Sequence, residues 1–486
     1  MDHSITVDHV AKAVKSLRSG KSDGGNMQTS DHLIQGLLTS MLHHGCVPNN
    51  MLLSTIIPIP KSAKKSLYKS NNYRGIALGS IIGKVLDKLI LDKFANLLST
   101  SDLQYGFKPH HSTTQCTYVV KETIQYYTDR GSSVYAMLLD ASQAFDRVEY
   151  VKLFKLLLQR NLCPMYARLL AVMYTNQCIR IKWGNQLTDK FTALNGVKQG
   201  GVLSPILFTI YIDVLLNLLS KSGYGCHIGH CFMGAFGYAD DVVILAPTML
   251  SLNTLLDISK EFSDEYQVLF NMDKFKFLVF GDTSNTDASI NVGASVINSV
   301  THDDHLGNTI GNKSCSVSVT KCTNDFTSKV NKLITYFDCS YHNTKYTLFQ
   351  SFCMNLYGCV LWDYSSKDVN GFFIRWRKCL RRFLHLPMRT HNALLALICM
   401  DIPVEVQLHL RLLKFFINIL SSDNSRTRLC GLLTLNGSLS DVSNSVNFIC
   451  NLYGIDKYQL LHVPFSSFKR TILTLPINKH QNNTEF

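Results

Sequence analysis

Three aspartates stand where very apolar segments end, and they are the residues of this sequence best suited to chemistry. Asp140 ends the run VYAMLLD, and Asp240 with Asp241 separates the apolar runs FMGAFGY and VVILA. Carboxylates that converge beside a core repel one another unless a cation lies between them. Mg²⁺ binds carboxylate oxygens together with substrate phosphates, and a pair of such ions supports phosphoryl transfer. The pattern therefore predicts a two-metal phosphoryl-transfer site, although Asp-Asp alone is also an ordinary turn sequence.

The segments around these aspartates predict the elements that position them. Residues 134–140 form a β-branched and aliphatic run, which predicts a strand that leads into a helix. Residues 232–238 and 242–246 predict two strands joined by a tight turn that contains the Asp-Asp pair. Residues 252–266 have helical spacing, and residues 267–280 are mostly strand-like. The aspartates are thus expected at strand ends, beside a core and open to solvent on one side.

The rest of the chain is mostly helical in pattern. Residues 1–50 predict helices joined by a Gly/Ser-rich turn, GKSDGGN, at 20–26. Residues 76–98 predict an amphipathic helix, and helical periodicity dominates residues 318–421. The last 65 residues show no clear pattern.

Composition indicates a folded chain that contacts a polyanion. The 486 residues carry 48 Lys plus Arg against 35 Asp plus Glu, a net charge of +13, and 46% hydrophobic residues. The length predicts several packed units, and the charge favours binding to phosphates. The 15 cysteines are scattered without a Cys-x-x-Cys pair, and the N-terminus has no signal-peptide core. We therefore expect a reducing compartment, nuclear or cytoplasmic, and no secretion.

One apolar stretch is nearly long enough to span a membrane. Residues 201–219 read GVLSPILFTIYIDVLLNLL, with Pro205, Asp213 and Asn217 inside the run. An unpaired aspartate in mid-membrane costs about 2.5 kcal/mol or more. The stretch therefore predicts a buried core helix, and no membrane partner is expected.

Two regions carry an excess of positive charge. Residues 51–100 contain eight basic residues and two acidic ones, which favours anion binding over a solvated face of mixed sign. Residues 371–389 contain six basic residues and no acid, with apolar residues at helical spacing. The apolar stripe predicts the core of a helical bundle, and the opposite face suits a phosphate backbone. The Cys/His cluster at 226–231 has poor spacing for zinc, and residues 302–305 are expected to mark a turn before a hairpin.

Eight blocks, taken in order, resemble a known family. Five blocks resemble the palm motifs of reverse transcriptases: LLDASQAFDRV (138–148), GVKQGGVLSPILF (196–208), GYADDVVILA (237–246), NMDKFKFLVF (271–280) and HLGNTI (305–310). The fingers motifs of non-long-terminal-repeat (non-LTR, LINE-type) retrotransposons are resembled by IIPIPK (56–61), NNYRGIAL (71–78) and QYGFKPHHSTTQ (104–115). A lone Tyr-x-Asp-Asp is weak support, whereas eight ordered blocks over about residues 10–420 are specific.

The resemblance implies a fold class and a domain order. The fold would be α/β, or α+β, in the form of a right-hand polymerase with fingers, an antiparallel palm sheet and a helical thumb. The implied units are an N-terminal helical extension (1–55), a reverse transcriptase domain of fingers and palm (56–311), a helical thumb (312–425) and a C-terminal tail of unknown role (426–486). The implied activity is RNA-templated DNA synthesis from dNTPs on a DNA primer, and protein partners are unknown.

The resemblance also assigns residue roles. Asp140, Asp240 and Asp241 would be the catalytic residues that hold two Mg²⁺ ions, with Mn²⁺ as a substitute. The implied nucleotide-binding residues are Lys61, Arg74, Phe145, Gln199, Gly200 and Lys274. The implied nucleic-acid-binding residues are Tyr238, Arg375, Arg377, Lys378, Arg381 and Arg382. Phe145 matches an aromatic gate under the sugar, and Lys274 matches a general acid for pyrophosphate; their alternatives are a core aromatic and an ordinary surface lysine.

The sequence departs from the family pattern at several places, and other functions stay open. Phe275 stands where the family usually has a small hydroxyl residue, and residues 20–26 match their motif only loosely. We expect a chain that polymerises but does not nick its own target, because no endonuclease-like region or Cys/His knuckle is present; it is a candidate truncated copy or gene-model fragment. The alternatives are a catalytically silent nucleic-acid-binding remnant, an RNA-dependent RNA polymerase and a structural module.

Overall fold

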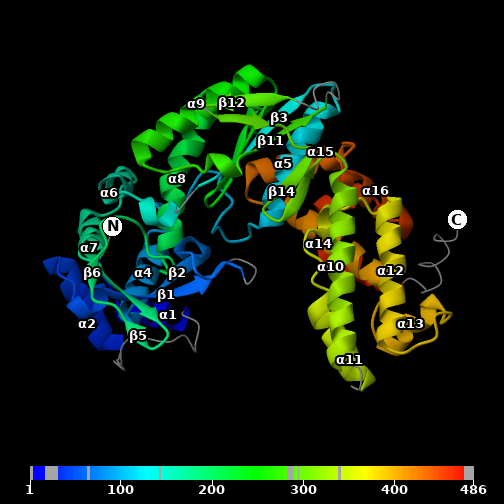
Figure 1. The fold of residues 1–486 in the computed structure, drawn as a ribbon, viewed down its shortest axis with the longest axis horizontal. Helices are drawn as coiled ribbons and strands as arrows, with labels where there is room; N and C mark the ends of the chain where they lie inside the picture. Colours follow the sequence, from blue (N-terminus) through cyan, green and yellow to red (C-terminus); the bar gives the residue numbers. More distant parts are fainter. Residues whose placement is uncertain are drawn as a thin grey trace.

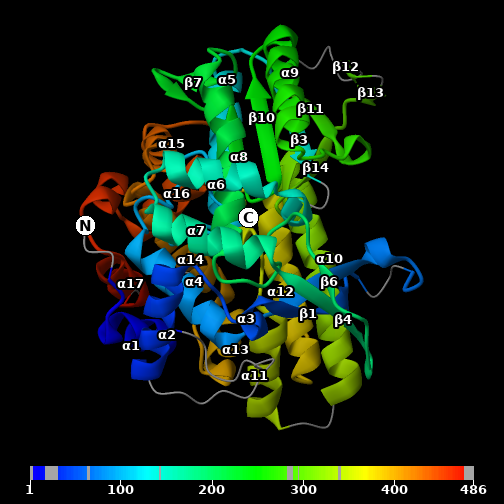
Figure 2. The same ribbon diagram turned by 90° about the vertical axis from the view of Figure 1, so that its left-hand side faces the viewer.

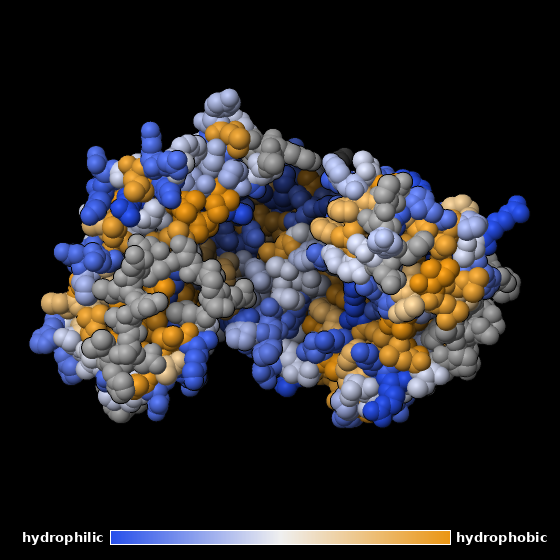
Figure 3. All heavy atoms as spheres, turned by 90° about the horizontal axis from the view of Figure 1, so that it is seen from below, coloured by the Kyte–Doolittle hydropathy of each residue, from blue (hydrophilic) through white to orange (hydrophobic). Residues whose placement is uncertain are grey.

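The chain forms an arch whose two lobes enclose a hollow. In the computed structural model, the described residues are 4–16, 31–62, 66–141, 144–281, 288–293, 295–337 and 341–474. One lobe holds the N-terminal half of the chain, and helices from α10 (Ser314–Phe337) onward form the other (Figure 1). The space-filling view from below shows the hollow between the lobes, with many hydrophilic residues on its wall (Figure 3). The chain contains both helices and β-sheets, which confirms the predicted mixed α/β class.

The fingers are built on a five-stranded sheet. Its order is β2-β1-β4-β5, with β6 also paired to β4; β1 runs antiparallel to β2 and parallel to β4. The strands are β1 (Leu53–Pro60), β2 (Tyr73–Leu78), β4 (Cys178–Trp183), β5 (Gln186–Leu187) and β6 (Phe191–Thr192). The helices of this lobe include α3 (Asn49–Leu52), α4 (Ile81–Lys93), α6 (Tyr150–Gln159) and α7 (Pro164–Thr175). The helix predicted from residue 76 begins at Ile81, because residues 73–78 pair with β1 instead.

The N-terminal helices belong to the fingers and not to a separate extension. Helices α1 (Val7–Ser16) and α2 (Asp31–His44) confirm the helical pattern, and the turn predicted at 20–26 lies outside the described residues. Lys93 Nζ donates to the Ser4 carbonyl at 2.7 Å, and Arg168 Nη2 donates to the His43 carbonyl at 2.9 Å. These bonds tie both ends of the N-terminal helical region to the fingers helices.

The palm is an antiparallel sheet of four strands. Its order is β11-β3-β10-β9, formed by β3 (Val134–Asp140), β9 (Ala235–Tyr238), β10 (Asp241–Ala246) and β11 (Lys276–Phe280). The two central strands are almost fully buried, as their β-branched and aliphatic sequences require. Helices α5 (Thr113–Thr128), α8 (Ser204–Lys221) and α9 (Met249–Tyr266) pack on this sheet (Figure 2).

Helix α8 confirms the prediction of a core helix. It is long and apolar enough to cross a membrane, and so is the bent pair α13 (Asn392–Cys399) with α14 (Val404–Leu420) if it is taken as one span. However, 61% of the α8 window is buried inside the protein. Asp213 accepts hydrogen bonds from the Ser101 N–H and hydroxyl and pairs with Arg160 at 3.2 Å. The charge inside the apolar run is thus satisfied within the protein.

The thumb is helical, and small hairpins connect it to the palm. Its helices are α10, α11 (His342–Cys353), α12 (Lys367–Phe383), α13 and α14. The hairpins β12–β13 (Ser289–Val292 and Ser295–Asn298) and β14–β15 (His302–His305 and Asn308–Gly311) precede α10 in the chain, whereas the hairpin β7–β8 (His227–Ile228 and Cys231–Phe232) lies between α8 and β9. Residues 302–305, expected as a turn, are therefore a strand of the hairpin itself. A turn of 3-10 helix, η3 (Met272–Lys274), interrupts the strand predicted over 267–280.

Residues 425–474, in which the sequence predicted no clear pattern, contain three helices. Helices α15 (Ser425–Leu435), α16 (Asp441–Tyr453) and α17 (Phe465–Thr474) pack back against the body. Tyr118 on α5 hydrogen-bonds Thr434 at 2.6 Å, and Lys121 pairs with Asp441 at 2.8 Å. Glu122, 2% exposed, accepts a bond from the Ser438 hydroxyl at 3.2 Å. The C-terminal segment thus joins the thumb to the palm helix α5.

Glu122 makes the stability of the contact between α5 and the C-terminal segment depend on pH. Burial raises the pKa of its carboxyl from 4.5 to about 7. Between these values the unfolded chain ionises while the folded chain keeps the proton, so stability falls as pH rises. We expect Glu122→Gln to be more stable than the wild type at pH 8, by up to about 3 kcal/mol, with the difference vanishing below pH 4.5.

Urea unfolding of both proteins at several pH values measures this difference. Glu261→Gln, which changes an exposed glutamate on α9, is the matched control and should show no such gain. Parallel stability curves for the wild type and Glu122→Gln across pH 4 to 8 would contradict the prediction.

Candidate active site

The palm sheet brings the three predicted aspartates together. Asp140 is the last residue of β3 and pairs in register with Asp241, the first residue of β10. Asp240 precedes Asp241 in the turn that leads from β9, and Tyr238 lies opposite Asp241 on that strand. All three aspartates are half-buried. The strand pairing therefore places two carboxylates side by side and a third one residue away.

The electrostatics of the site show an excess of negative charge. Burial raises the pKa of Asp241 to about 6, and Asp240 and Asp140 add to the shift. Burial, followed by the charge of Asp140, also raises the pKa of Asp240. Lys274 Nζ lies 2.7 Å from Asp140 Oδ1 and lowers the pKa of both other aspartates. The cluster thus carries an excess of negative charge that Lys274 offsets in part and that a further cation would offset.

The donor set fits a hard divalent cation, but the side chains are not preset around one. The three carboxylates supply the oxygen ligands that such an ion prefers. Within the described ranges, no three or more His, Cys, Asp and Glu side chains form a ready-made metal-binding group. The Asp140 carboxylate is instead paired with Lys274. An ion bound here would therefore compete with Lys274 for the Asp140 carboxylate.

Two basic residues of the fingers face the palm carboxylates. Lys61 follows β1 and acts electrostatically on Asp146, just after the first catalytic strand. Arg74 lies on β2 and lowers the pKa of Asp240. Both side chains are exposed. The structure thus brings the predicted Lys61 and Arg74 to the space between fingers and palm, where a triphosphate would meet them.

Phe145 lies just after β3, between the core and the space beside the aspartates, and its role as a gate stays a prediction. Its ring is half-buried and stacks on Phe208 at a centroid distance of 4.7 Å. Its carbonyl accepts the Val197 N–H at 2.7 Å, which fixes the backbone below the ring. The ring is therefore held on one side by the core and keeps its other side partly open.

The loop that contains Gln199 and Gly200 joins the fingers to the palm. The Ala77 N–H on β2 donates to the Gln199 carbonyl at 2.7 Å. Gly200 has φ +111°, and a β-carbon there would lie 3.0 Å from the Ala77 carbonyl oxygen. On the palm side, the Gly196 N–H donates to the Val148 carbonyl at 2.9 Å. Glycine is thus required where this loop touches the fingers.

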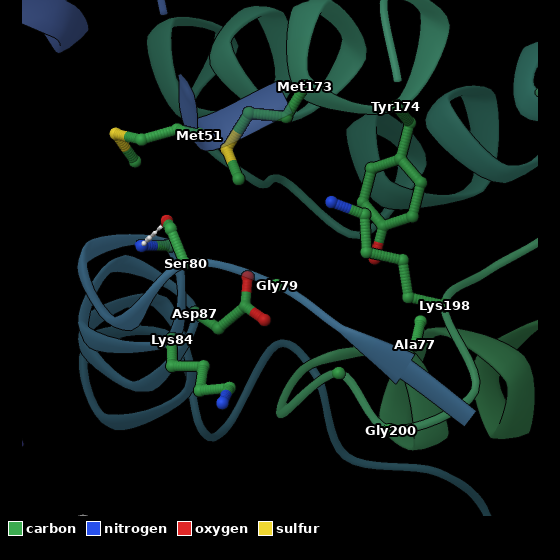
Figure 4. A pocket seen from close by; sticks show the side chains of 12 residues that line it. Met51, Ala77, Gly79, Ser80, Lys84, Asp87, Met173, Tyr174, Lys198 and Gly200 are labelled. Atoms are coloured by element: carbon green, nitrogen blue, oxygen red, sulfur yellow. Dashed lines mark hydrogen bonds between the residues drawn. The ribbon is translucent and has the colours of Figure 1, made fainter. Parts of the chain in front are cut away.

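A small pocket lies beside this loop, and it contains charged residues to which the sequence motifs gave no role. Figure 4 shows Asp87 and Lys198 projecting into the pocket that Gly200 and Tyr174 also line. Asp87 Oδ2 accepts the Leu203 N–H at 3.3 Å, and burial raises its pKa to about 6 while Lys198 lowers it. Lys198 could have been found from the sequence, because it directly precedes the predicted residue Gln199. The sequence of helix α4 does not indicate that Asp87 lies in the same pocket as Lys198.

Lys274 reaches the site through a local turn. The Asn271 N–H donates to the Asp140 carbonyl at 2.9 Å, so η3 is anchored to the end of β3. Phe275, the departure from the family pattern, is 6% exposed and its ring lies 6.5 Å from that of Phe270. The bulky residue is therefore accommodated in the core and leaves the Lys274 ammonium at the carboxylates.

The thumb arginines need a correction. Arg381 is 7% exposed, and its guanidinium donates to the Thr390 carbonyl at 2.8 and 3.0 Å, so it is a structural residue of the thumb. Arg377 is paired with Glu405. The helical spacing placed both arginines on the face predicted to bind nucleic acid. A local pattern could not show that Thr390 and Glu405 are their partners. Arg375, Lys378 and Arg382 are exposed, and nucleic-acid contact by them stays a prediction.

A comparison with known protein families identifies the class to which this fold and site belong. Residues 59–340, more than half of the chain, match the family described as reverse transcriptase (RNA-dependent DNA polymerase). The chain belongs to this family. Its members generally use divalent metal ions and bind a nucleic-acid template.

The relatives include proteins of non-LTR retrotransposons, as the motifs predicted. The Pol polyprotein of the type-2 retrotransposable element R2DM of Drosophila melanogaster is 24% identical over 286 residues, 56% of this chain and 27% of that protein. The RNA-directed DNA polymerase from mobile element jockey of the same species is 23% identical over 424 residues, 80% of this chain and 45% of that protein. The chain thus spans less than half the length of these relatives.

Solved structures of telomerase also resemble the chain. Telomerase from Candida tropicalis, in complex with a fragment of telomeric RNA, is 12% identical, with a TM-score of 0.43 over 94% of this chain and 71% of that one.

Gly200 provides a test of the loop contact. In Gly200→Ala, the added β-carbon meets the Ala77 carbonyl oxygen, so the loop must move away from the fingers. We expect kcat/KM for the dNTP to fall by at least about tenfold, because a small displacement of a substrate-positioning loop is costly.

Gly131→Ala is the matched control for this variant. Gly131 also has a positive φ, +73°, but a β-carbon there meets nothing within 4 Å. Both variants should lose about 1 to 2 kcal/mol of stability from backbone strain, whereas only Gly200→Ala should lose activity. Equal activity of the two variants would count against the contact.

Proposed function

We propose that this chain is an RNA-directed DNA polymerase of the non-LTR retrotransposon type, which adds dNTPs to the 3′-hydroxyl of a primer on an RNA template. The observation that carries the proposal is the in-register pairing of Asp140 with Asp241, with Asp240 in the adjoining turn. The fingers cations Lys61 and Arg74 act on the same acidic region. Family membership supports the same activity.

Asp140, Asp240 and Asp241 are the residues that would hold the divalent ions, which we take to be two Mg²⁺, replaceable by Mn²⁺. When bound, such ions activate a 3′-hydroxyl and neutralise a triphosphate. Burial, and after it the neighbouring carboxylates, raises the pKa values of Asp240 and Asp241, and a bound cation would favour the ionised form of both.

The chain's own residues orient the other substrates. Lys61 and Arg74 bind the triphosphate from the fingers side, and the loop of Gln199 and Gly200 lies beside the incoming base. Phe145 lies under the sugar and excludes a 2′-hydroxyl by contact. Lys274, once released from Asp140, is the cation positioned to give a proton to the leaving pyrophosphate. A template–primer duplex would lie in the hollow between the lobes (Figure 3).

Primer extension on a homopolymer RNA tests this function directly. The wild type should extend a DNA primer with the complementary dNTP and Mg²⁺. Asp240→Asn should lose at least about a hundredfold in rate, because it removes a charge that stabilises the transition state, while its affinity for the duplex is kept. Asp257→Asn, an exposed carboxylate on α9, is the matched control with full activity.

Primer extension, together with binding of the duplex at low and high salt, distinguishes the competing functions. A silent remnant would bind the duplex without extension by either protein, and an RNA polymerase would prefer rNTPs. A structural module would bind nucleic acid with little dependence on salt, whereas phosphate contacts make affinity fall steeply between low and high salt.

Phe145 allows a prediction on sugar selection. Phe145→Val removes ring volume from a site braced by Phe208, so a 2′-hydroxyl gains room. We expect the preference for dNTP over rNTP, as the ratio of kcat/KM values, to fall by at least about tenfold. Phe154→Val, a half-buried aromatic on α6, should leave the ratio unchanged. An unaltered ratio in Phe145→Val would show that the ring is only a core residue.

A further inference from the structure

A short segment, residues 103–106, lies against the turn that holds Asp240. The Tyr105 N–H donates to the Gly237 carbonyl at 2.7 Å, and the Gly237 N–H donates to the Leu103 carbonyl at 2.9 Å. These bonds form a parallel bridge between Gln104 and Gly237. The segment therefore extends the palm sheet beyond β9, on the side away from β10.

The side chain of Gln104 connects this segment to the catalytic turn. It is fully buried, and its Oε1 accepts the Ala239 N–H at 2.9 Å and the Gly106 N–H at 2.8 Å. Ala239 directly precedes Asp240. A single amide oxygen thus satisfies two buried N–H groups and joins two segments more than a hundred residues apart in the sequence.

Ala239 needs such support because its backbone is strained. Its φ is +59°, in the left-handed region, which costs a residue with a β-carbon about 1 to 2 kcal/mol. Gly106 permits the close approach, since a β-carbon on it would lie 2.4 Å from the Ala239 nitrogen. A strained conformation persists only where the surroundings determine it. Here the surroundings are Gln104 and Gly106.

Tyr105 fixes the segment from behind. Its ring is fully buried and lies 6.2 Å from Phe236, and its hydroxyl hydrogen-bonds Thr427 on α15 at 2.9 Å. The segment is therefore held between the palm sheet and the C-terminal helices. These contacts, made outside the turn, help to hold Gln104 Oε1 in place.

We propose that Gln104 is a positioning residue of the polymerase: its amide oxygen holds Ala239 in the left-handed conformation and so aims the Asp240 carboxylate at the divalent-ion site. This inference rests on the proposed function. Loss of the acceptor would let the turn relax and misplace one carboxylate.

Two substitutions of similar shape distinguish the hydrogen-bond acceptor of the Gln104 side chain from the volume that this side chain fills. Gln104→Met fills the same space without an acceptor, whereas Gln104→Glu, neutral when buried, keeps a carbonyl oxygen. In primer extension by the full chain, Gln104→Met should lower kcat about ten- to a hundredfold with little change in KM for the duplex. Gln104→Glu should retain most of the activity.

Gln115→Met is the matched control. Gln115 is also buried, and its amide reaches the Ser422 hydroxyl at 3.4 Å, outside the catalytic turn. This variant should keep the wild-type kcat. A thermal melting curve for each protein shows whether a loss of activity reflects unfolding.

A second substitution tests the conformation itself. Glycine adopts a positive φ without strain, so Ala239→Gly should restore much of the kcat lost in Gln104→Met. Mn²⁺ affinity, measured from the electron paramagnetic resonance signal of free Mn²⁺, gives a readout independent of turnover. It should weaken in Gln104→Met and recover in the double variant.

The outcomes distinguish the two proposals. If the wild type does not extend a primer, the proposed function fails. If the wild type extends but Gln104→Met matches it in kcat and Mn²⁺ affinity, the role of Gln104 is overturned. The role is also overturned if Met and Glu are equally impaired and Ala239→Gly restores neither, because Gln104 then serves only to fill the core.

Discussion

The repulsion among three carboxylates at one end of the palm sheet is the constraint on which the rest of the structure depends. Pairing of β3 with β10 places Asp140 beside Asp241, so the folding of the most apolar strands of the chain creates an unfavourable charge cluster. Burial, and after it the neighbouring carboxylates, raises the pKa of Asp241, and Lys274 forms an ion pair with Asp140. The buried faces of the two strands favour the pairing that creates the cluster. A bound cation would offset the charge that this pairing brings together.

The loop of residues 196–203 explains how the fingers and palm act on one substrate. It bonds to Val148 and Phe145 on the palm side and to Ala77 on the fingers side. The loop therefore links the backbone at Phe145, which follows β3, to strand β2. These links are backbone hydrogen bonds and not flexible side chains. In the proposed function, the arrangement of the nucleotide site thus depends on the packing of the fingers sheet on the palm.

The sequence predicted the parts of this structure that are local. The strand ending at Asp140, the turn at Asp240 and the core helix α8 follow from apolar periodicity and from residues that break it. The ordered motifs added the roles, and the structure brings Lys61, Arg74, Phe145 and Lys274 to the site. What periodicity could not show is pairing between distant residues. Arg381 has the spacing of a basic face, yet Thr390 and the surrounding helices bury it, and Asp87 gives no sign in α4 that it meets Leu203.

The C-terminal segment is a second case in which contacts between distant residues could not be predicted from the sequence. Besides the apolar residues that α16 buries at helical spacing, this segment makes polar contacts with distant residues: Thr427 with Tyr105, Thr434 with Tyr118, and Asp441 with Lys121. Each contact joins residues separated by more than 300 positions, so no local pattern records it. Because these groups are largely buried, breaking them without replacement by water is unfavourable. The helices after residue 424 therefore hold the thumb against α5, next to the segment that supports the catalytic turn. They form part of the folded body and not an appendage to it.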